Sequence, residues 1–412
     1  MTIQSVRGFR DILPPQSRRF ADFEKIAREV FALYGYGEIR VPAVEMRELF
    51  VKSTGETTDI VEKEMYSFED AGGRKLALRP EGTPGVARAY IEQNLSAQSP
   101  RQKLFYMGNM YRAERPQQGR YREFEQIGAE CIGNPHPAAD AEIIALLSDI
   151  LRRAGINDFS VEINSLGCAQ CRPAHREKLI AFLNSRKETL CENCKKRIEK
   201  NPLRALDCKT DGPALFKDAP VQELCPDCGK HFDAVQLFLK ETGIPFAVNR
   251  AIVRGLDYYS RTVFEFRNAR LGAQDAIAGG GRYDALIRSM GGPEAAAVGW
   301  GLGVDRAVSL MPEAAYPGPE VFVISMEEAA HSAAFKLMAE LRKAGISTDG
   351  GAFAQSMKAQ LKAADKCGAK FAAIIGGNEL AKQSAAVKNL KTGEQAEIPF
   401  QDIARHLAKE TP

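Results

Sequence analysis

Residues 123–133, EFEQIGAECIG, restrict the fold of this chain more than any other stretch. Their strict alternation is typical of a β-strand, in which successive side chains point to opposite faces. One face carries the odd-numbered positions from Glu123 to Cys131. The other carries Phe124, Gln126, Gly128 and Glu130, in that order along a line. Because the preceding KLFYMGNMYR is aromatic and apolar, and a Pro/Gly turn separates the two runs, the pattern predicts an antiparallel hairpin with a floor for a flat polar ligand.

The same hairpin gathers charges of both signs. Residues 112–130, RAERPQQGRYREFEQIGAE, contain four arginines and four glutamates. In an arbitrary surface hairpin such charges pair across the strands in solvent. The apolar flanks favour the alternative, which is a site for a ligand that carries both anionic and cationic groups.

Length and composition exclude several classes of protein. A chain of 412 residues can form two or three domains, and 44% hydrophobic with 26% charged residues is ordinary for a globular protein. The net charge of +3 permits contact with a polyanion but does not require it. No apolar run reaches the length of a membrane span, and MTIQSVRGFRD lacks the apolar core of a secretory signal. We therefore expect a cytoplasmic protein that does not contact a membrane.

Four segments differ in composition and in hydrophobic pattern, and together they predict an α+β fold. Residues 1–166 alternate helical and strand-like stretches, and residues 167–235 are charged, helical and dotted with cysteines, as in an insertion. Strand signals and glycines return over residues 236–315, so the first core is expected to resume there. After the Pro-rich MPEAAYPGPE, residues 319–412 alternate as βαβαβ, which predicts a small sheet of the parallel type.

Two further stretches carry candidate site residues. LRPEGTPGVARAY places Glu81 and Thr83 between a strand and a helix, where Thr83 could serve only as an N-cap. VRGLDYYSRTVFEF places Arg254, Tyr258 and Tyr259 at the entry of a strand, where the tyrosines could form a plain aromatic core pair. Both interpretations stay open on the residues alone.

The glycine-rich stretches do not predict a nucleotide fold of the common kinds. VGWGLGVDRAVSLM packs glycines before a helix that is expected to begin near Val304 and to carry Arg306 in its first turn. Its spacing is not G-x-G-x-x-G, and no G-x-x-x-x-G-K-[ST] occurs, so a dehydrogenase or P-loop enzyme is disfavoured. Arg112, Arg254 and Arg306 nevertheless offer planar forks suited to phosphate.

Several motifs together resemble a known family. R-x-E-R-P, a loop and F-x-Q-x-G over residues 112–128, with G-L-G-x-[DE]-R over 301–306, are similar to motifs 2 and 3 of class II aminoacyl-tRNA synthetases. RPEGT, RGLDYY and GGGRYD look like the signatures of bacterial-type histidyl-tRNA synthetases. The resemblance runs from VRGFRDILP through the final βαβαβ segment, which looks like the anticodon-binding domain of that family. Asp305 departs from the glutamate that many relatives carry before the arginine.

The resemblance implies an activity, its substrates and an assembly. Histidine would be activated by ATP, with Mg²⁺, to the adenylate with release of pyrophosphate, and then transferred to the 3′ end of tRNA(His). Such chemistry needs positioning and electrostatic stabilisation of an in-line displacement at phosphorus. An antiparallel-sheet catalytic core of the class II kind is expected. Pro42 in IRVPAVE matches the first motif of the family, which implies a homodimer.

The resemblance also implies roles for single residues. For ATP, Arg112 would hold the α-phosphate, Glu114 would face the adenine, Phe124 would stack on it, and Arg306 would reach the γ-phosphate. Arg254 would stabilise charge on the α-phosphate, so that Arg112 and Arg254 are the catalytic candidates.

Other residues are implied for histidine and tRNA. The ammonium group would meet Glu81, Gly82, Thr83 and Gln126. The imidazole would be selected by Glu130 and Tyr259, with Tyr258 beside them, and Arg112 and Arg254 would also face the amino acid. Gln117 and Arg120 in the loop PQQGRY would contact the acceptor end of tRNA.

Seven of the nine cysteines lie between residues 168 and 228. Cys168-x2-Cys171, Cys191-x2-Cys194 and Cys225-x2-Cys228, with Cys208 between them, have the spacing of zinc knuckles. The alternative is a helical insertion with reduced thiols, since clustered cysteines in a reducing compartment rarely form disulfides. Structural zinc in the insertion is therefore a hypothesis, and no metal ligand is expected among the catalytic residues.

Two rival functions share the scaffold. One is a synthetase-like regulatory subunit of the phosphoribosyltransferase of histidine biosynthesis, and such paralogues generally lack the anticodon domain and drift at catalytic positions. The other is a noncatalytic RNA-binding or signalling protein. The retained arginines and the final domain favour the enzyme over both.

Overall fold

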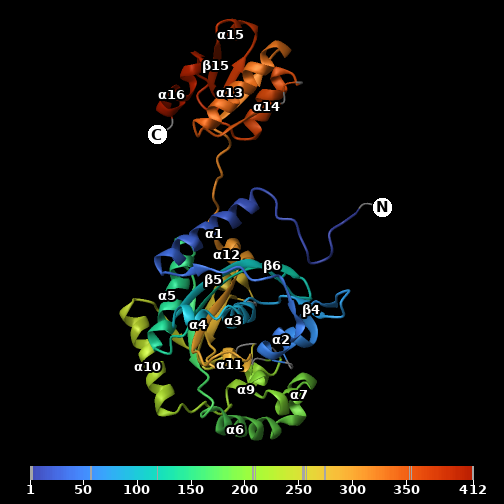
Figure 1. The fold of residues 1–412 in the computed structure, drawn as a ribbon, viewed down its shortest axis with the longest axis vertical. Helices are drawn as coiled ribbons and strands as arrows, with labels where there is room; N and C mark the ends of the chain where they lie inside the picture. The colour runs from blue at the N-terminus through green and yellow to red at the C-terminus, as the bar shows by residue number, and fades with distance from the viewer. Residues whose placement is uncertain are drawn as a thin grey trace. The chain divides into compact units, whose positions relative to one another are not determined.

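The computed structural model describes residues 3–55, 58–117, 119–206, 208, 210–252, 256, 258–272, 275–351, 353 and 355–410. It comprises two compact units, Met1–Pro312 and Glu313–Pro412 (Figure 1).

A large sheet is the centre of the first unit. Among the described residues its strands are β1 (Gly37–Glu38), β5 (Gln102–Tyr111), β6 (Glu123–Ile132), β7 (Ser160–Ser165), β8 (Ala247–Val248), β9 (Ser260–Arg267), β10 (Ala276–Arg282) and β11 (Ala297–Gly303). They lie in the order β1-β5-β6-β11-β10-β9-β7-β8. The inner pairs are antiparallel, and only the edge pairs β1·β5 and β7·β8 are parallel in the described sheet. The expected antiparallel core is confirmed.

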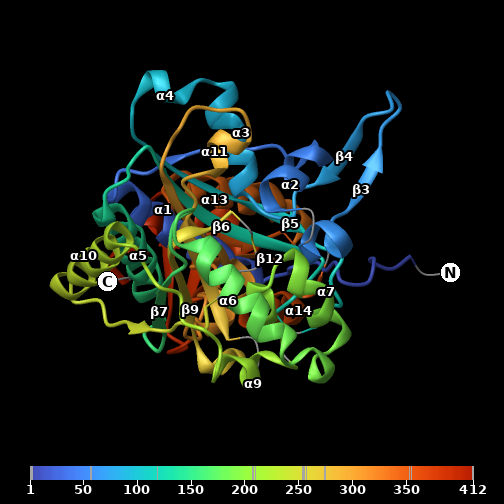
Figure 2. The ribbon, with the colours of Figure 1, turned by 90° about the horizontal axis from the view of Figure 1, so that it is seen from below.

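A smaller antiparallel sheet projects from this unit. It consists of β2 (Val44–Met46), β4 (Lys75–Leu78) and β3 (Ser67–Glu69), and β3 and β4 extend away from the core in Figure 2. Val44, Met46 and Phe68 on its strands are between 41% and 47% exposed, which is unusual for large apolar side chains on a short sheet.

Helices complete the first unit. They are α1 (Gln16–Leu33), α2 (Arg47–Thr54), the π-helix η1 (Ile60–Glu64), α3 (Thr83–Glu92), α4 (Leu95–Gln98), α5 (Pro137–Arg153), α10 (Pro226–Glu241), the 3₁₀-helix η3 (Ala269–Leu271), α11 (Leu286–Ser289) and α12 (Val304–Leu310). Helix α1 ends before Gly35, which has a φ of +72° that suits a helix C-terminus. The expected start of a helix at Val304 is confirmed.

The main hydrophobic core lies between the large sheet and helices α1, α5 and α10. Phe31 stacks on Phe105 with ring centroids 4.1 Å apart, and the buried Trp300 Nε1 donates a hydrogen bond of 3.0 Å to the Ile143 carbonyl oxygen. Ile127, Ala129 and Cys131 of β6 belong to this core. The alternation predicted for β6 is confirmed, and its other face is left for a site.

The cysteine-rich insertion forms a group of short helices. They are α6 (Arg172–Asn184), η2 (Lys187–Thr189), α7 (Glu192–Lys200), α8 (Leu203–Leu206) and α9 (Gly212–Phe216), and α6, α7 and α9 lie together at one end of the unit (Figures 1 and 2). Helix α10 continues past residue 235 to Glu241 and packs on α5, so one helix joins the insertion to the core.

The second unit is a five-stranded sheet with helices. Its elements are β12 (Val321–Ser325), η4 (Glu328–Ala330), α13 (His331–Lys343), β13 (Thr348–Gly350), α14 (Met357–Lys366), β14 (Phe371–Ile375), α15 (Gly377–Ala381), β15 (Ser384–Asn389), β16 (Gln395–Pro399) and α16 (Phe400–Glu410). The βαβαβ order is confirmed, and β13, β12 and β14 are parallel. Beyond this βαβαβ part, β15 and β16 extend the sheet with antiparallel pairs, and a short turn joins these two strands.

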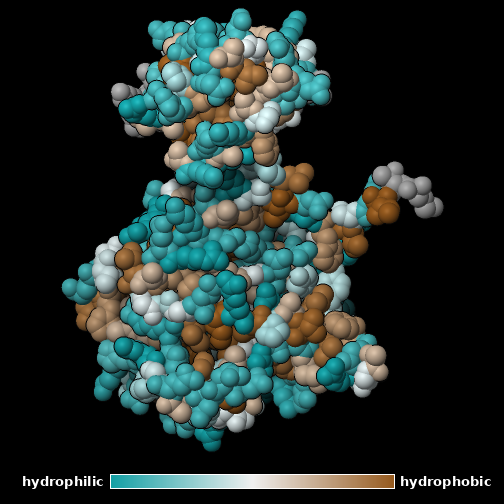
Figure 3. Space-filling view, turned by 45° about the horizontal axis from the view of Figure 1, so that its top comes forward, coloured by the Kyte–Doolittle hydropathy of each residue, from teal (hydrophilic) through white to brown (hydrophobic). Residues whose placement is uncertain are grey.

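The face seen in Figure 3 is a mosaic in which small groups of hydrophobic side chains lie among hydrophilic ones. Over the described residues, no helix combines the length and the apolar composition that crossing a membrane would require.

Candidate active site

A cavity of about 310 Å³ lies over the polar face of β6. Its lining includes Arg112, Glu114, Arg120, Phe124, Gln126 and Arg306. All four residues expected to bind ATP are therefore brought to one space, although they come from β6, the loop before it and the first turn of α12.

Backbone carbonyls hold the two key arginines in place. Arg112 Nε donates a hydrogen bond of 2.9 Å to the Pro80 carbonyl, and its guanidinium carbon lies 5.4 Å from the centre of the Phe124 ring. Arg306 donates to the carbonyl oxygens of Gly119, at 3.2 Å, and Ala276, at 2.5 Å. Anchoring of this kind fixes the plane of each fork before a ligand arrives.

The positive charges repel one another. Burial is the main cause that lowers the pKa of Arg306, and the neighbouring Arg120 and Arg112 lower it further, while Glu114 opposes them. Three guanidinium groups that face one cavity favour a polyanion as its occupant.

The loop before β6 is partly tied to the cavity. Arg120 Nη1 donates a hydrogen bond of 2.6 Å to Glu114 Oε2, and the backbones of Gln117 and Arg120 pair across a turn. Arg120, expected at the tRNA acceptor end, thus lies at the cavity, whereas Gln117 is exposed.

The N-terminal segment contacts two residues that line this cavity. Asp305 accepts an ion-pair contact from Arg10, whose guanidinium lies 3.9 Å from the centre of the Tyr121 ring. Asp305, which stands where many relatives carry glutamate, lines the cavity directly.

A buried carboxyl lies farther along β6. Glu130 is 0% exposed, and its oxygens accept hydrogen bonds from Thr83 at 2.7 Å and from the Tyr283 hydroxyl. Burial raises the pKa of Glu130 to about 8, hydrogen bonds from Tyr283 and Thr83 oppose the rise, and Glu81 adds to it. The group is therefore mostly protonated at neutral pH and sensitive to any ligand that donates or carries positive charge.

A second carboxyl lies beside the first. Glu81 is 4% exposed and accepts hydrogen bonds from Thr54 at 3.0 Å and from Tyr258 at 2.9 Å. The Tyr258 ring is 4.7 Å from Tyr259 and 5.7 Å from Tyr283, measured between centroids. The expected residues Glu81, Thr83, Glu130, Tyr258 and Tyr259 are thus gathered into one buried aromatic and acidic cluster.

The space over Gly128, which belongs to the predicted floor for a ligand, is filled by a side chain. A Cβ atom there would lie 2.2 Å from Cζ of Tyr106, and a Cβ on Gly82 would lie 2.2 Å from the same ring. The Tyr106 hydroxyl donates a hydrogen bond of 3.0 Å to Gln126. Both glycines therefore accommodate a tyrosine from the neighbouring strand.

Thr83 does not cap α3 in the structure. The N-cap is Gly82, and the Thr83 hydroxyl donates to Glu130 instead. The alternative that Thr83 serves only as an N-cap is therefore wrong. The first turn of α3 lies against β6, so the hydroxyl group reaches a buried carboxyl group.

Sequence reasoning missed Tyr106, Tyr283, Thr54 and the glycines of β11. Gly299 and Gly301 face β6, where a Cβ would lie 1.7 Å from Glu130 Oε2 and 2.9 Å from Gln126 Nε2, respectively. The motif GGGRYD contains Tyr283, so this residue could have been found from the sequence. No neighbouring residue in the chain, however, indicates its contact with Glu130. Arg254, the other catalytic candidate, lies outside the described residues.

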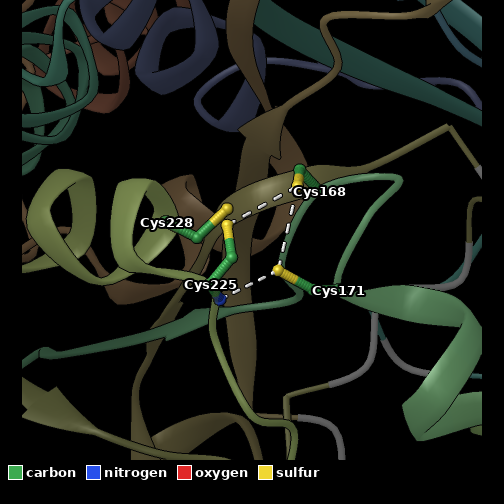
Figure 4. A group of neighbouring side chains, drawn as sticks. All are labelled: Cys168, Cys171, Cys225 and Cys228. Carbon is green, nitrogen blue, oxygen red and sulfur yellow. Dashed lines mark hydrogen bonds between the residues drawn. The ribbon is translucent and has the colours of Figure 1, made fainter.

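Two groups of side chains in the insertion could hold a metal ion. The first is Cys168, Cys171, Cys225 and Cys228, drawn in Figure 4, and the second is Cys191, Cys194, Cys208 and Asp211. Within each group the potential ligand atoms all lie within 4.8 Å of one another. The three cysteine pairs predicted from spacing therefore divide between two clusters. Two pairs form the first cluster, and the third pair joins Cys208 and Asp211 in the second.

Comparisons with known proteins cover both units. Residues 8–307 match the model of the family described as histidyl-tRNA synthetase, and residues 320–410 match the anticodon binding domain. The chain is 54% identical to the histidine--tRNA ligase of Elusimicrobium minutum over 98% of each chain, and 46% identical to that of Geobacter sulfurreducens over 97% of each. The apo crystal structure of the S. aureus histidyl-tRNA synthetase superposes with a TM-score of 0.83 at 31% identity, covering 98% of this chain and 100% of that one. With a family model that spans most of its length and relatives this similar from end to end, the chain belongs to the histidyl-tRNA synthetase family.

Proposed function

We propose that this protein is a histidine--tRNA ligase, which activates histidine with ATP and transfers it to the 3′ end of tRNA(His). The observation that carries the proposal is that one strand, β6, supplies Phe124 and Gln126 to the arginine-lined cavity and Glu130 to the buried cluster beside it. The cavity suits a triphosphate, and the cluster, with two buried carboxyls among tyrosines, suits a cationic amino acid rich in N–H donors.

Each part of ATP has a candidate partner. Phe124 offers a ring for the adenine and Glu114 an acceptor for its amino group, while Arg112 and Arg306 receive the α- and γ-phosphates. Mg²⁺ accompanies the nucleotide and offsets the charge of the leaving pyrophosphate.

Histidine is held by the aromatic and acidic cluster, which is the histidine pocket of this proposal. Glu81, Thr83 and Gln126 receive its ammonium group, with Gly82 beside them, and Glu130 accepts an imidazole N–H. Tyr259 and Tyr258 flank the ring. A site built on buried acceptors discriminates strongly, because a substrate without the matching donor leaves them unpaired.

The chemical step is an in-line displacement. A carboxylate oxygen of histidine attacks the α-phosphorus, a new C–O–P linkage forms, and the bond from the α-phosphorus to the bridging oxygen breaks to release pyrophosphate. Arg112 stabilises the charge that develops on the phosphorus oxygens, and Arg254 is proposed to act with it.

Transfer requires tRNA at the same pocket. Gln117 and Arg120 are proposed to approach its acceptor end, and residues 320–410 to bind its anticodon, as the match to that domain supports. As an enzyme of translation the protein is proposed to work in the cytoplasm.

The protein is proposed to form a homodimer. Besides Pro42 in the first motif, the exposed Val44, Met46 and Phe68 of the small sheet supply an apolar surface that a second copy would cover. Multi-angle light scattering during gel filtration tests this, with a mass of about twice the 45.2 kDa of one chain expected.

We also propose that the insertion contains zinc.

Pyrophosphate exchange with histidine and ATP tests the main proposal. Exchange that depends on histidine is expected, and aminoacylation of tRNA(His) should follow. Absence of both, in protein that binds tRNA, would favour the noncatalytic RNA-binding alternative. The regulatory-subunit alternative is disfavoured by the second match over residues 320–410 and by the presence of Arg112 and Arg306 in one cavity.

A further inference from the structure

We infer that the insertion holds two zinc ions in different donor sets, and that the first of them positions the histidine pocket while the second stabilises only the insertion. The inference rests on the proposed histidine activation for its functional half. Its metal half stands on the geometry of the two clusters.

The first cluster has the dimensions of a tetrahedral thiolate site. Cys168 Sγ lies 3.8 Å from Cys171 Sγ and 3.9 Å from Cys225 Sγ. Four sulfurs at about 2.3 Å from a central zinc would lie about 3.8 Å apart. The backbone N–H of Cys225 also donates to Cys171 Sγ at 3.2 Å, which suits a thiolate ligand.

The second cluster offers three sulfurs and one carboxylate. Cys191 Sγ lies 3.8 Å from Cys208 Sγ, and Asp211 completes the group. Carboxylate oxygen is an accepted zinc ligand, so Asp211 occupies the place that a fourth cysteine takes in the first cluster.

The hydrophobic core of the insertion is small. Its own hydrophobic cluster consists of Leu179, Leu183, Leu190, Cys194, Ile198, Ala205 and Leu215. A segment of this size rarely folds on such a core without disulfides or metals. The described cysteines form no disulfide bonds, so a metal ion is the remaining means of cross-linking them.

The two clusters occupy different places in the chain. The first joins both ends of the insertion, since Cys168 and Cys171 precede α6 while Cys225 and Cys228 begin α10. The second lies wholly inside, at the starts of α7 and α9 and between α8 and α9. The first is therefore the cluster that lies where the chain leaves the catalytic core and returns to it.

The first cluster is linked directly to the histidine pocket. Arg172, which follows Cys171, donates a hydrogen bond to the carbonyl oxygen of Tyr259. The backbone of Arg261 donates to Gly167, next to Cys168, at 2.9 Å. A cavity of about 560 Å³ is lined both by Ala169 of the Cys168–Cys171 turn and by Tyr258.

The metal count is the first test. Protein purified without chelator should contain two zinc ions per chain by inductively coupled plasma mass spectrometry. Cys191→Ser/Cys208→Ser should lose one ion, and Cys168→Ser/Cys225→Ser should lose the other. Wild-type protein with one zinc ion or none would overturn the two-site assignment, whether or not it activates histidine.

The division of roles is tested by pyrophosphate exchange in the same preparations. Loss of the first site should raise KM for histidine about ten- to hundredfold, with KM for ATP little changed, because misplacement of a pocket wall acts on the substrate it holds. Loss of the second site should leave both constants near wild type. Equal effects of the two double variants would refute the division.

Arg172→Met provides a variant that keeps every ligand. It should retain two zinc ions and still raise KM for histidine, with kcat changed less, since Arg172 acts by positioning Tyr259. An unchanged KM for histidine would break the proposed link. Failure of wild-type exchange would instead refute the proposed function and leave the metal count to stand separately.

Discussion

Glu130→Gln tests whether a buried titratable carboxyl controls the binding of histidine. Burial raises the pKa of Glu130 to about 8, so at pH 7 roughly one carboxyl in ten is ionised. The ionised form is the better acceptor for an imidazole N–H. We therefore expect kcat/KM for histidine in the wild type to rise about tenfold from pH 7 to pH 9. Glutamine has nearly the same shape but does not titrate, so this rise should be absent in the variant.

The assay is pyrophosphate exchange at saturating ATP across this pH range. Dividing the wild-type profile by the variant profile cancels the ionisation of histidine itself, which both proteins share. The ratio should rise about tenfold and level off above pH 8 to 9. A ratio that stays constant with pH would refute the assignment of Glu130 as the titrating acceptor.

Stability supplies an independent readout of the same pKa. Because the folded pKa of about 8 exceeds the ordinary value of 4.5, the native state keeps a proton that the unfolded chain releases. Between these two pH values the free energy of unfolding should fall as pH rises, by at most about 5 kcal/mol from this group. Glu130→Gln should remove this loss, so the variant should gain stability relative to the wild type at pH 8.5 but not at pH 4.5. Urea unfolding that shows the same difference at both pH values would contradict the shift.

Three further substitutions test other parts of the site and core. Arg306→Gln removes a charge from the phosphate cavity and should raise KM for ATP about ten- to hundredfold, as expected for a charged hydrogen bond, with KM for histidine as the internal control. Asp140→Asn removes the buried carboxylate of the Arg282–Asp140 pair, in which both side chains are 0% exposed, and leaves the partly exposed Asp284 as the other carboxylate partner of Arg282. It should lower the free energy of unfolding by about 3 kcal/mol in urea titrations, whereas Asp233→Asn at an exposed position of α10 should not. Gly128→Ala places a methyl group 2.2 Å from the Tyr106 ring and should raise KM for histidine at least tenfold, while Gly37→Ala, whose nearest contact is 4.0 Å away, serves as the matched control; wild-type kinetics in Gly128→Ala would mean that Tyr106 yields freely.

Local patterns in the chain were sufficient to predict many of the elements and several residues of the arginine-lined cavity. The period of two in residues 123–132 predicts both the strand and its two faces, because side-chain direction in a strand depends only on position. The glycines and Arg306 around Val304 likewise mark a strand that ends where a helix begins. Residues that lie close together in one motif also lie close together in the fold. The sequence could therefore place Arg112, Glu114 and Phe124 at one site.

Contacts between distant segments could not be read in this way. Tyr283 reaches Glu130 across 153 residues, and Tyr106 fills the space over Gly128 from the neighbouring strand. A glycine in a sequence shows only that a side chain is missing, and which neighbour uses the space depends on strand register and packing.

The cysteines show the same boundary. Their spacing predicts two-residue knuckles, yet it cannot say that Cys168 and Cys171 meet Cys225 and Cys228 while Asp211 joins the cysteines between them. The distance between the two cysteines of one knuckle depends on a single turn of backbone. Which knuckles pair depends instead on how the fold brings the starts of α6 and α10 together. The burial that raises the pKa of Glu130 likewise arises only when β6, β11 and α3 are packed together, because desolvation is a property of surrounding atoms and not of neighbouring residues in the chain.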